Sequence, residues 1–451
     1  MLVRRSFSSL AGLAFALVSL AGCASEASSA PAPTAVGPTS DAPPAVDPAS
    51  QKPALDHGSV STKYPAFAPS MPRLVHQGGA VLKAPHIITI VYDGDPNAAA
   101  YEKLADEIGA SAYWSQVVSE YGVGAASSAA TSHVRMGAQP ALTFGPNTAP
   151  EEAVQAYVLQ ALEDTATSHW PEPKEDVIYT LFFHGDLAQS MCADGMGGFH
   201  ASVDVKGKTI AYALVLACDG DPKMSVLDGA TVSASHEWAE AATDPYPEAK
   251  PAWEGLGDDD LGWELMVQGQ DENGDLCEFD EDSYGSYGAP AFASMVQRQW
   301  SNASAAAGHA PCVPAPQNPY FNVALLDAKS VAAKITRQEF PWSKATRGYA
   351  AAVGQSVDVA LGFVSDAATA PFTITATELD PFDDSGAFEL PPEKRTLTLS
   401  LDKTTGQNGE KAYLHVQVDK PSASGNVHLV LVDATLGQER HTMPIVVVDG
   451  P

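Results

Sequence analysis

Basic residues are scarce in this chain of 451 residues: 25 lysines and arginines stand against 55 aspartates and glutamates, a net charge of -30. A protein this acidic repels phosphate groups, which excludes nucleic acids and anionic lipid headgroups as the partners it is built to bind. Long hydrophobic runs are also lacking, since the apolar run at 10–20 is too short to span a bilayer. The acidity suits an exported, soluble protein or one with cation-binding loops.

Cysteine is rare as well, with five residues and no C-x-x-C spacing, which argues against a thiolate metal site. Setting aside Cys23, which belongs to the N-terminal signal discussed next, four cysteines remain. An even number in an oxidising compartment indicates two disulfides, and three pairings are open. We favour Cys192–Cys218 and Cys277–Cys312, because each closes the shorter loop.

The N-terminus reads as an export signal. Arg4 and Arg5 precede the apolar run, and Leu20-Ala21-Gly22-Cys23 follows it, so residues 1–22 are expected to be a signal peptide. The tetrad resembles a bacterial lipobox, which implies cleavage before Cys23, lipidation of its thiol and an exported lipoprotein on the outer membrane or cell surface. The membrane is then a partner through this lipid. The alternative is a cleaved signal with an incidental cysteine.

Residues 23–75 are rich in alanine, proline, serine and threonine, which predicts a disordered stalk. Order is expected from residue 76. Buried strands are predicted for three apolar, β-branched runs at 86–92, 177–183 and 210–216. Helices are predicted at 98–116 and 151–163, so residues 76–315 form an α/β domain.

The segment after Pro245 is acidic and has little periodicity up to residue 313. A loop of this length inside a compact domain is typically functional or held by ligands. From 319 to 451 the pattern changes to short alternating runs at 321–326, 357–363, 372–377, 396–401, 412–418, 427–432 and 444–448. They predict an immunoglobulin-like β-sandwich, with a spacer or adhesive role because it holds no cysteine or reactive cluster.

One helix carries the chemistry. Ser235-His236-Glu237-Trp238-Ala239-Glu240 belongs to an alanine-rich segment that Pro245 ends. His236 and Glu240 lie one turn apart on the same face, where an imidazole and a carboxylate can bind one divalent cation. Glu237 is offset by about a quarter turn and could act as general base for the attacking water. This is the H-E-x-x-H pattern of zinc proteases with Glu240 in place of the second histidine.

An ordered set of motifs surrounds this helix. It comprises Gly78-Gly79, Tyr121-Gly122-Val123, Cys192 followed by Gly197-Gly198-Phe199-His200, the helix up to Asp244-Pro245, Ala252-Trp253, Gly274-Asp275-Leu276-Cys277-Glu278, and Val296-Gln297 with Trp300. On these features residues 78–313 resemble the phosphate-induced protein 1 (EXORDIUM-like) family and related bacterial secreted proteins. The resemblance implies a zincin-like α+β core and its site. Plant members lack the lipobox, stalk and C-terminal region, so their cell-wall roles are not carried over.

The third metal ligand is expected from the acidic loop. Asp275 lies next to Cys277, where a disulfide would supply the rigidity that a ligand needs. Asp244 is the reserve, with capping or turn formation as its other role. His200 is expected on a glycine-rich loop, where it either hydrogen-bonds substrate or an oxyanion or is a satisfied buried histidine.

Zn²⁺ is the expected cation, although one histidine and two carboxylates form a harder, more oxygen-rich ligand set than most structural zinc sites have. Asp271, Asn273 and Asp275 have the spacing of a calcium loop, but the downstream glutamate of an EF-hand is missing. A simpler Ca²⁺ site within 258–282 is the second cation expectation.

These features predict a surface-tethered zinc hydrolase, a peptidase acting on extracellular protein, peptide or a cell-surface polymer. His236, Glu240 and Asp275 would bind the metal, and Glu237 would be the general base. Two alternatives stay open: a non-catalytic adhesion lipoprotein whose motif holds a structural cation, and a carbohydrate-binding wall protein.

Overall fold

The computed structural model describes residues 62–65, 71–144, 148–193, 195–219, 223–280, 282–338, 340–382 and 390–450. These residues belong to one compact unit. The expected signal peptide, the lipidation of Cys23 and most of the stalk lie outside the described residues and stay predictions, as do the domain boundaries. Within the described ranges, no helix combines the length and the apolar character that a membrane span requires.

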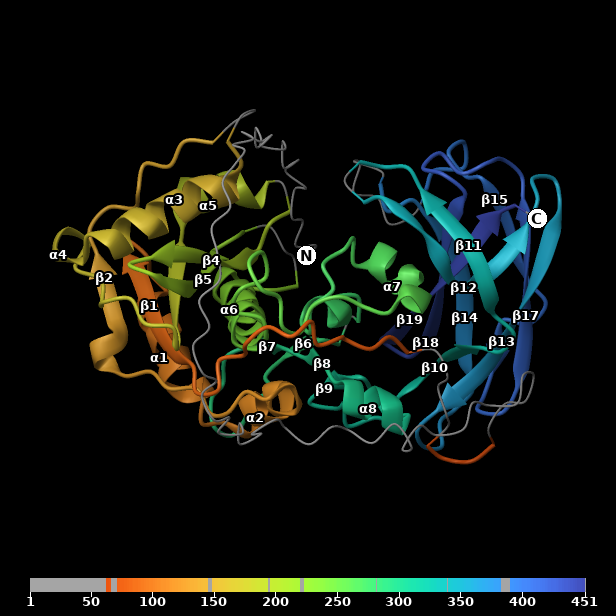
Figure 1. Cartoon of the computed structure of the whole chain (residues 1–451). Helices are drawn as coiled ribbons and strands as arrows, with labels where there is room; N and C mark the ends of the chain where they lie inside the picture. Colours follow the sequence, from red (N-terminus) through yellow and green to blue (C-terminus); the bar gives the residue numbers. More distant parts are fainter. Residues whose placement is uncertain are drawn as a thin grey trace, which may run out of the picture. The chain divides into compact units, whose positions relative to one another are not determined.

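A five-stranded sheet organises the first half of the described chain, in the order β2–β1–β3–β5–β4 (Figure 1). Its strands are β1 (His86–Tyr92), β2 (His133–Met136), β3 (Val177–Phe183), β4 (Gly198–Val205) and β5 (Lys208–Leu216). Neighbouring strands run parallel except β4, which is antiparallel to β5. The three predicted strands are therefore present, and β3 is buried along its whole length, as its continuous apolar sequence requires.

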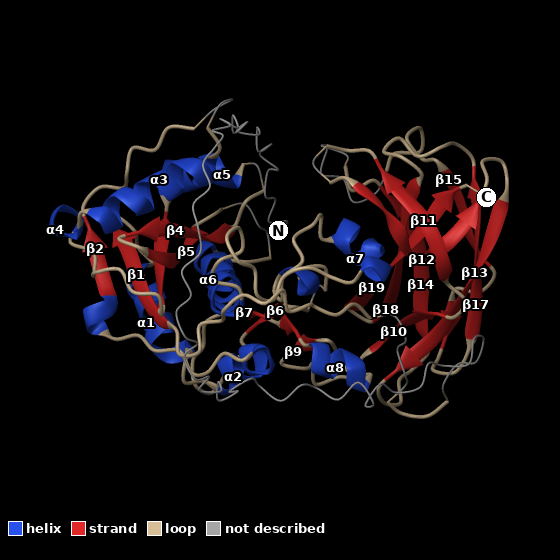
Figure 2. Cartoon of the chain, in the orientation of Figure 1, coloured by secondary structure: helices blue, strands red, loops and turns tan. Residues whose placement is uncertain are grey.

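Helices cover both faces of this sheet (Figure 2). They are α1 (Ala98–Ile108), α2 (Ala112–Val118), α3 (Pro150–Glu163), α4 (Thr165–Ser168), α5 (Gly185–Cys192) and α6 (Val226–Thr243). Alternate residues of β1 divide between two cores: Ile87 packs in the core with α1 and α6, and Ile88 in the core with α3. Helix α6 packs against β4 and β5, and this contact positions the site described below.

Two local predictions were wrong. The helix expected at 98–116 is broken between α1 and α2, where Ser111 is extended and its side chain caps a new helix by accepting from the Trp114 amide. The expected glycine-rich loop around His200 contains helix α5 and strand β4 instead, so His200 lies on a strand.

The acidic region after Pro245 contains only short elements. They are η4 (Asp258–Asp260), α7 (Leu261–Met266), η5 (Asp275–Cys277), β6 (Tyr284–Gly285), β7 (Val296–Gln297), β8 (Gln299–Trp300), α8 (Asn302–Ala307) and β9 (Cys312–Val313). Both favoured disulfides are present, Cys192–Cys218 and Cys277–Cys312. The second joins η5 to β9, and together the two indicate an extracellular or otherwise oxidising environment.

The C-terminal region is rich in strands, which form a four-stranded and a six-stranded sheet. The strands are β10 (Phe321–Leu325), β11 (Lys329–Ile335), β12 (Trp342–Ala351), β13 (Ser356–Ser365), β14 (Phe372–Leu379), β15 (Leu397–Leu401), β16 (Thr405–Gly406), β17 (Lys411–Val418), β18 (Val427–Leu436) and β19 (Glu439–Asp449). All seven predicted runs are strands, and β11, β12 and β16 were missed. Strand β11 carries lysines and is largely exposed, so it gives little hydrophobic signal. The protein is thus mixed α/β with a strand-rich C-terminal region.

Candidate metal centre

Helix α6 is unusual because its ionisable residues are buried. Ser225 caps its first turn by accepting from the Asp228 amide, and every residue from Ala230 to Thr243 is buried. Among them His236 is 3 %, Glu237 1 % and Glu240 2 % exposed. Burial of such groups is unfavourable unless they are paired or bind a cation. The helix therefore directs its polar face into the protein interior.

The acidic loop meets this polar face at His236. Its Nε2 atom lies 3.0 Å from Glu240 Oε2 and 3.5 Å from Asp275 Oδ1. The other oxygen of Asp275 accepts from the Glu272 amide at 3.0 Å, which orients the carboxylate. Helix α6 and the cystine-anchored η5 thus present two carboxylates to one nitrogen of the same imidazole.

Gly274 allows the loop to approach so closely. Its amide donates to Glu240 Oε1 at 3.2 Å. A Cβ at this position would lie 2.7 Å from both Glu240 Oε1 and His236 Nδ1. Only glycine leaves room there, because any side chain would occupy the space of the histidine and the glutamate.

Gln297 on β7 fixes the tautomer of His236. Its Nε2 donates to the Gly274 carbonyl at 2.7 Å, so its Oε1 must face His236 Nδ1 at 3.0 Å. An amide oxygen only accepts, and the Nδ1 atom of the neutral imidazole therefore carries the proton. The lone pair of Nε2 then faces the Glu240 and Asp275 oxygens. These acceptors repel one another unless a proton or a metal cation lies between them.

His200 approaches the same carboxylates from strand β4 and is 0 % exposed. Its Nδ1 lies 3.5 Å from Glu240 Oε2 and 3.6 Å from Glu237 Oε2. Its Nε2 lies 3.1 Å from the Asp244 carbonyl oxygen and 3.3 Å from Glu272 Oε1. The Glu237 Oε2 atom is buried and has no hydrogen-bond partner among the described residues.

Asp244 is buried at the C-terminal end of α6, and its side chain serves the turn. Oδ1 accepts from the Ala252 amide at 2.8 Å. The clusters of potential ligand atoms found in the described residues do not include this carboxylate. This contact supports the capping and turn role of Asp244, which the sequence had left open.

Among the residues that the structure describes, four groups of histidine and acidic side chains could hold a metal ion: His236–Glu237–Glu240, His236–Asp275–Glu278, His200–Glu240–Glu272 and Asp280–Asp282–His441. The first three share members and form one cluster, here called the cage: His200, His236, Glu237, Glu240, Glu272, Asp275 and Glu278. In the fourth group, Asp282 already pairs with the guanidinium of Arg298 at 2.7 Å, which supplies positive charge there. Its two aspartates lie in the acidic region and its histidine lies on β19, and the Ca²⁺ expectation for 258–282 stays a prediction.

Sequence reasoning missed Glu272, Glu278 and Gln297 as members of the site or its surroundings. Glu278 follows Asp275 by three residues and flanks Cys277, and this spacing is a signal that could have been used. Glu272 and Gln297 give no such signal, because their roles depend on the packing of β4 and β7 against α6.

The cage has strongly perturbed electrostatics. Burial would lower the pKa values of His200 and His236, but the carboxylates around them, Glu272 and Glu240 foremost, raise both well above the usual value. Burial raises the pKa of Asp275 to about 6 and that of Glu278 to about 8. Although burial opposes it, the two histidines hold the pKa of Glu240 below its usual value. Protons and a metal cation would therefore compete for the same atoms.

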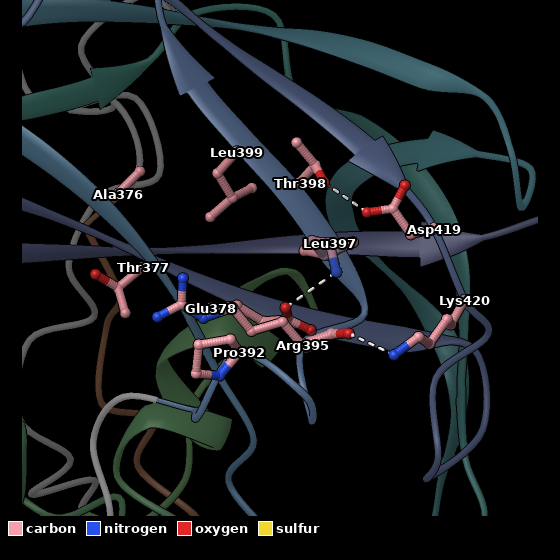
Figure 3. Close-up of a pocket in the computed structure, with 10 residues that line it drawn as sticks. All are labelled: Ala376, Thr377, Glu378, Pro392, Arg395, Leu397, Thr398, Leu399, Asp419 and Lys420. Atoms are coloured by element: carbon pink, nitrogen blue, oxygen red, sulfur yellow. Dashed lines mark hydrogen bonds between the residues drawn. The ribbon is translucent and has the colours of Figure 1, made fainter.

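A separate hollow of about 450 Å³ lies on the strand-rich region and is lined by Glu378, Arg395, Asp419 and Lys420 among others (Figure 3). The Glu378 carboxylate accepts from the Leu397 amide at 3.0 Å, and Asp419 accepts from the Thr398 hydroxyl at 2.6 Å. Lys420 donates to the Arg395 carbonyl at 3.2 Å. These polar groups satisfy one another, so the hollow offers no comparable site.

Neither a protein-family model nor a curated protein matches this sequence. Among solved structures, the titin M3 domain is similar at 16% identity over 22% of this chain and 85% of that chain, with a TM-score of 0.15. A family 123 glycoside hydrolase from Clostridium perfringens, studied for glycolipid glycan hydrolysis, is similar at 7% identity over 22% of each chain, also with a TM-score of 0.15. This chain thus spans about a fifth of that hydrolase. Likenesses this weak carry no argument about fold or function.

Proposed function

We propose that the protein is a metal-dependent hydrolase that binds Zn²⁺ in the cage through His236, Glu240 and Asp275. The observation that carries this proposal is the oriented lone pair of His236 Nε2, which faces Glu240 Oε2 at 3.0 Å and Asp275 Oδ1 at 3.5 Å. Zinc bonds of about 2.0–2.1 Å in a tetrahedron separate the ligand atoms by about 3.3 Å. The two distances from His236 Nε2 are close to this value, and histidine and carboxylate are both zinc ligands.

Glu237 is the general base in this proposal. A bound zinc ion supplies Lewis acidity and lowers the pKa of water. The Oε2 atom of Glu237 lies 3.6 Å from His200 Nδ1 and accepts no hydrogen bond from the described residues, so its lone pairs are available for a proton. It is therefore placed to accept the proton of the attacking water and to pass it to the leaving group.

The wider assignment is part of the same proposal. Residues 76–315 would be a zincin-like domain related to the EXORDIUM-like family, and residues 319–451 an immunoglobulin-like sandwich. Lipidation at Cys23 would tether the enzyme to the outer membrane or cell surface, where extracellular peptides are the substrates. The two disulfides support an exported protein.

A structural cation without catalysis is the second candidate. The observation that favours it is the burial of the cage, whose members other than Glu278 are all buried. A cation in such a position would neutralise the carboxylates and join α6 to the acidic loop. In that case the C-terminal region would mediate adhesion.

Elemental analysis of the purified full chain, followed by digestion of a peptide library, separates the candidates. Under the hydrolase proposal, Glu237→Gln keeps the metal and loses hydrolysis by about 10²–10⁴-fold. A metal-loaded wild-type protein that cleaves nothing supports the structural cation. A protein that binds no cation would contradict both the hydrolase and the structural-cation proposal.

A further inference from the structure

We propose that His200 is a ligand of the same cation through its Nδ1 atom, so that strand β4 contributes to the metal centre together with α6 and the acidic loop. This inference rests on the proposed binding of a cation in the cage. It changes the role of His200 from contacting substrate to holding the metal.

The tautomer of His200 follows from its two sides. On one side, Nε2 faces the Asp244 carbonyl oxygen at 3.1 Å and Glu272 Oε1 at 3.3 Å. A backbone carbonyl only accepts hydrogen bonds, so Nε2 carries a proton that it donates there. In the neutral ring, the lone pair is therefore on Nδ1 and faces Glu237 and Glu240.

His236 has the same arrangement. Its Nδ1 atom donates to the Gln297 amide oxygen at 3.0 Å, and its Nε2 atom faces Glu240 Oε2 at 3.0 Å. The Nδ1 atom of His200 faces that same oxygen at 3.5 Å. Glu240 Oε2 thus lies close to two imidazole lone pairs, each directed by a fixed acceptor on the far side of its ring. Glu240 belongs to a candidate metal group with each histidine, and its Oε2 is the atom that a cation held by both imidazoles would share.

The donor set that results is better suited to zinc than the one expected from the sequence. Two imidazole nitrogens and one carboxylate oxygen form a common zinc set, whereas calcium prefers oxygen ligands alone. Adding His200 therefore favours Zn²⁺ over Ca²⁺ at this position. Asp275 completes the set from the loop side.

Glu272 supports His200 from behind. Its Oε1 lies 3.3 Å from His200 Nε2, whereas Glu240 and Glu237 face Nδ1. A carboxylate beside the protonated nitrogen of a metal-bound histidine favours the proton there and increases the basicity of the ring. Glu272 is therefore a positioning residue and acts through His200.

The position of His200 argues against direct contact with substrate. The side chain is 0 % exposed, and both ring nitrogens face protein oxygens. Its strand pairs in register with β5, His200 opposite Ala213, and this pairing holds it in the sheet. A histidine that binds substrate would need a free nitrogen directed at an open surface.

The test uses the full chain, stripped of metal with a chelator and titrated with Zn²⁺ against a chromophoric competitor. We expect His200→Ala to weaken Zn²⁺ binding by at least about 100-fold and Glu272→Gln by about 10–100-fold. His415→Ala is the matched control, because His415 lies on β17, outside the cage, and bonds to Asp358. It should bind Zn²⁺ like the wild type.

A second measurement does not depend on variants that could fail to fold. In wild-type protein loaded with ¹¹³Cd²⁺, the ¹⁵N spectrum of histidine should show coupling between the metal and His200 Nδ1. Unchanged affinity in His200→Ala together with no such coupling would overturn the inference while leaving zinc binding through His236 intact. Coupling in a protein that cleaves no peptide would leave the inference standing and reject the hydrolase. A wild-type protein that binds neither Zn²⁺ nor Cd²⁺ overturns both the inference on His200 and the proposed function.

Discussion

The backbone amide of Gly274 donates to Oε1 of Glu240 at 3.2 Å, and this bond joins the acidic loop to helix α6 beside the proposed ligands. The other oxygen of Glu240 remains directed at His236 and His200. One carboxylate therefore has two separate tasks: Oε1 anchors the loop and Oε2 faces the cage. The geometry of the site depends on the backbone of the loop as much as on its side chains.

Gly274→Ala tests this dependence. The added Cβ would lie 2.7 Å from Glu240 Oε1 and His236 Nδ1, so the loop must move away from the helix. We expect Zn²⁺ affinity to fall at least about tenfold and the free energy of unfolding to fall by about 1–3 kcal/mol. Calorimetric Zn²⁺ titration and urea unfolding measure the two effects.

Gly229→Ala is the control on the same helix, because a Cβ there meets no atom within 4 Å. It should stabilise the protein by about 0.5–1 kcal/mol and leave Zn²⁺ affinity unchanged. Equal Zn²⁺ affinity in the two alanine variants would show that the close approach of the loop has no part in the site.

Gln297→Leu tests the orientation of His236. The variant keeps a similar volume but removes both the acceptor for His236 Nδ1 and the donor to the Gly274 carbonyl. We expect Zn²⁺ affinity to fall by about 10–100-fold, as is usual when the partner of a metal-bound histidine is lost. Co²⁺ absorption would report the change in ligand geometry, and a spectrum and affinity equal to those of the wild type would contradict the assigned tautomer.

The sequence predicted the elements whose cause is local. The strand at 177–183 follows from its continuous apolar composition, and the polar face of α6 follows from the spacing of His236 and Glu240. Both disulfides followed from loop length alone. Each of these features depends on residues close in sequence or on a simple property of the chain.

The environment of His200 could not be predicted in this way. Its tautomer depends on the carbonyl oxygen of Asp244, which is 44 residues away. Its placement on β4 depends on pairing with β5, and the glycines before it suggested a loop. Glu272 and Gln297 likewise gain their roles only when the acidic loop and β7 pack against α6. Long-range packing decides these contacts, and a single sequence does not encode it in a readable pattern.

Asp271 predicts a pH dependence of stability. Burial and the neighbouring carboxylate of Glu264 raise the pKa of Asp271 from 3.8 to about 9. Between these two values the unfolded chain releases this proton and the folded protein keeps it. The contribution of the Asp271 carboxyl group to the free energy of unfolding is therefore fully present below pH about 4 and is lost as the pH rises towards 9. In metal-free protein, Asp271→Asn should show a smaller loss of unfolding free energy over this range than the wild type.

Urea unfolding at intervals between pH 4 and 9 measures the effect. Asp176→Asn, which changes an exposed aspartate, should follow the wild-type curve. Parallel curves for Asp271→Asn and wild type would mean that the carboxyl group titrates alike in both states.

The two disulfides allow stability to be separated from metal binding. Cys277–Cys312 spans 35 residues and Cys192–Cys218 spans 26. Loop-closure entropy predicts that removing them costs about 4 and about 3.5 kcal/mol, so the two double serine variants should be destabilised almost equally. Only Cys277–Cys312 anchors η5, which carries Asp275. We therefore expect Cys277→Ser/Cys312→Ser to lose Zn²⁺ affinity as well as stability, and Cys192→Ser/Cys218→Ser to lose stability alone. Zn²⁺ titration of both variants under conditions where they remain folded measures the difference, and the same affinity in both would mean that Asp275 does not need its cystine anchor to bind the cation.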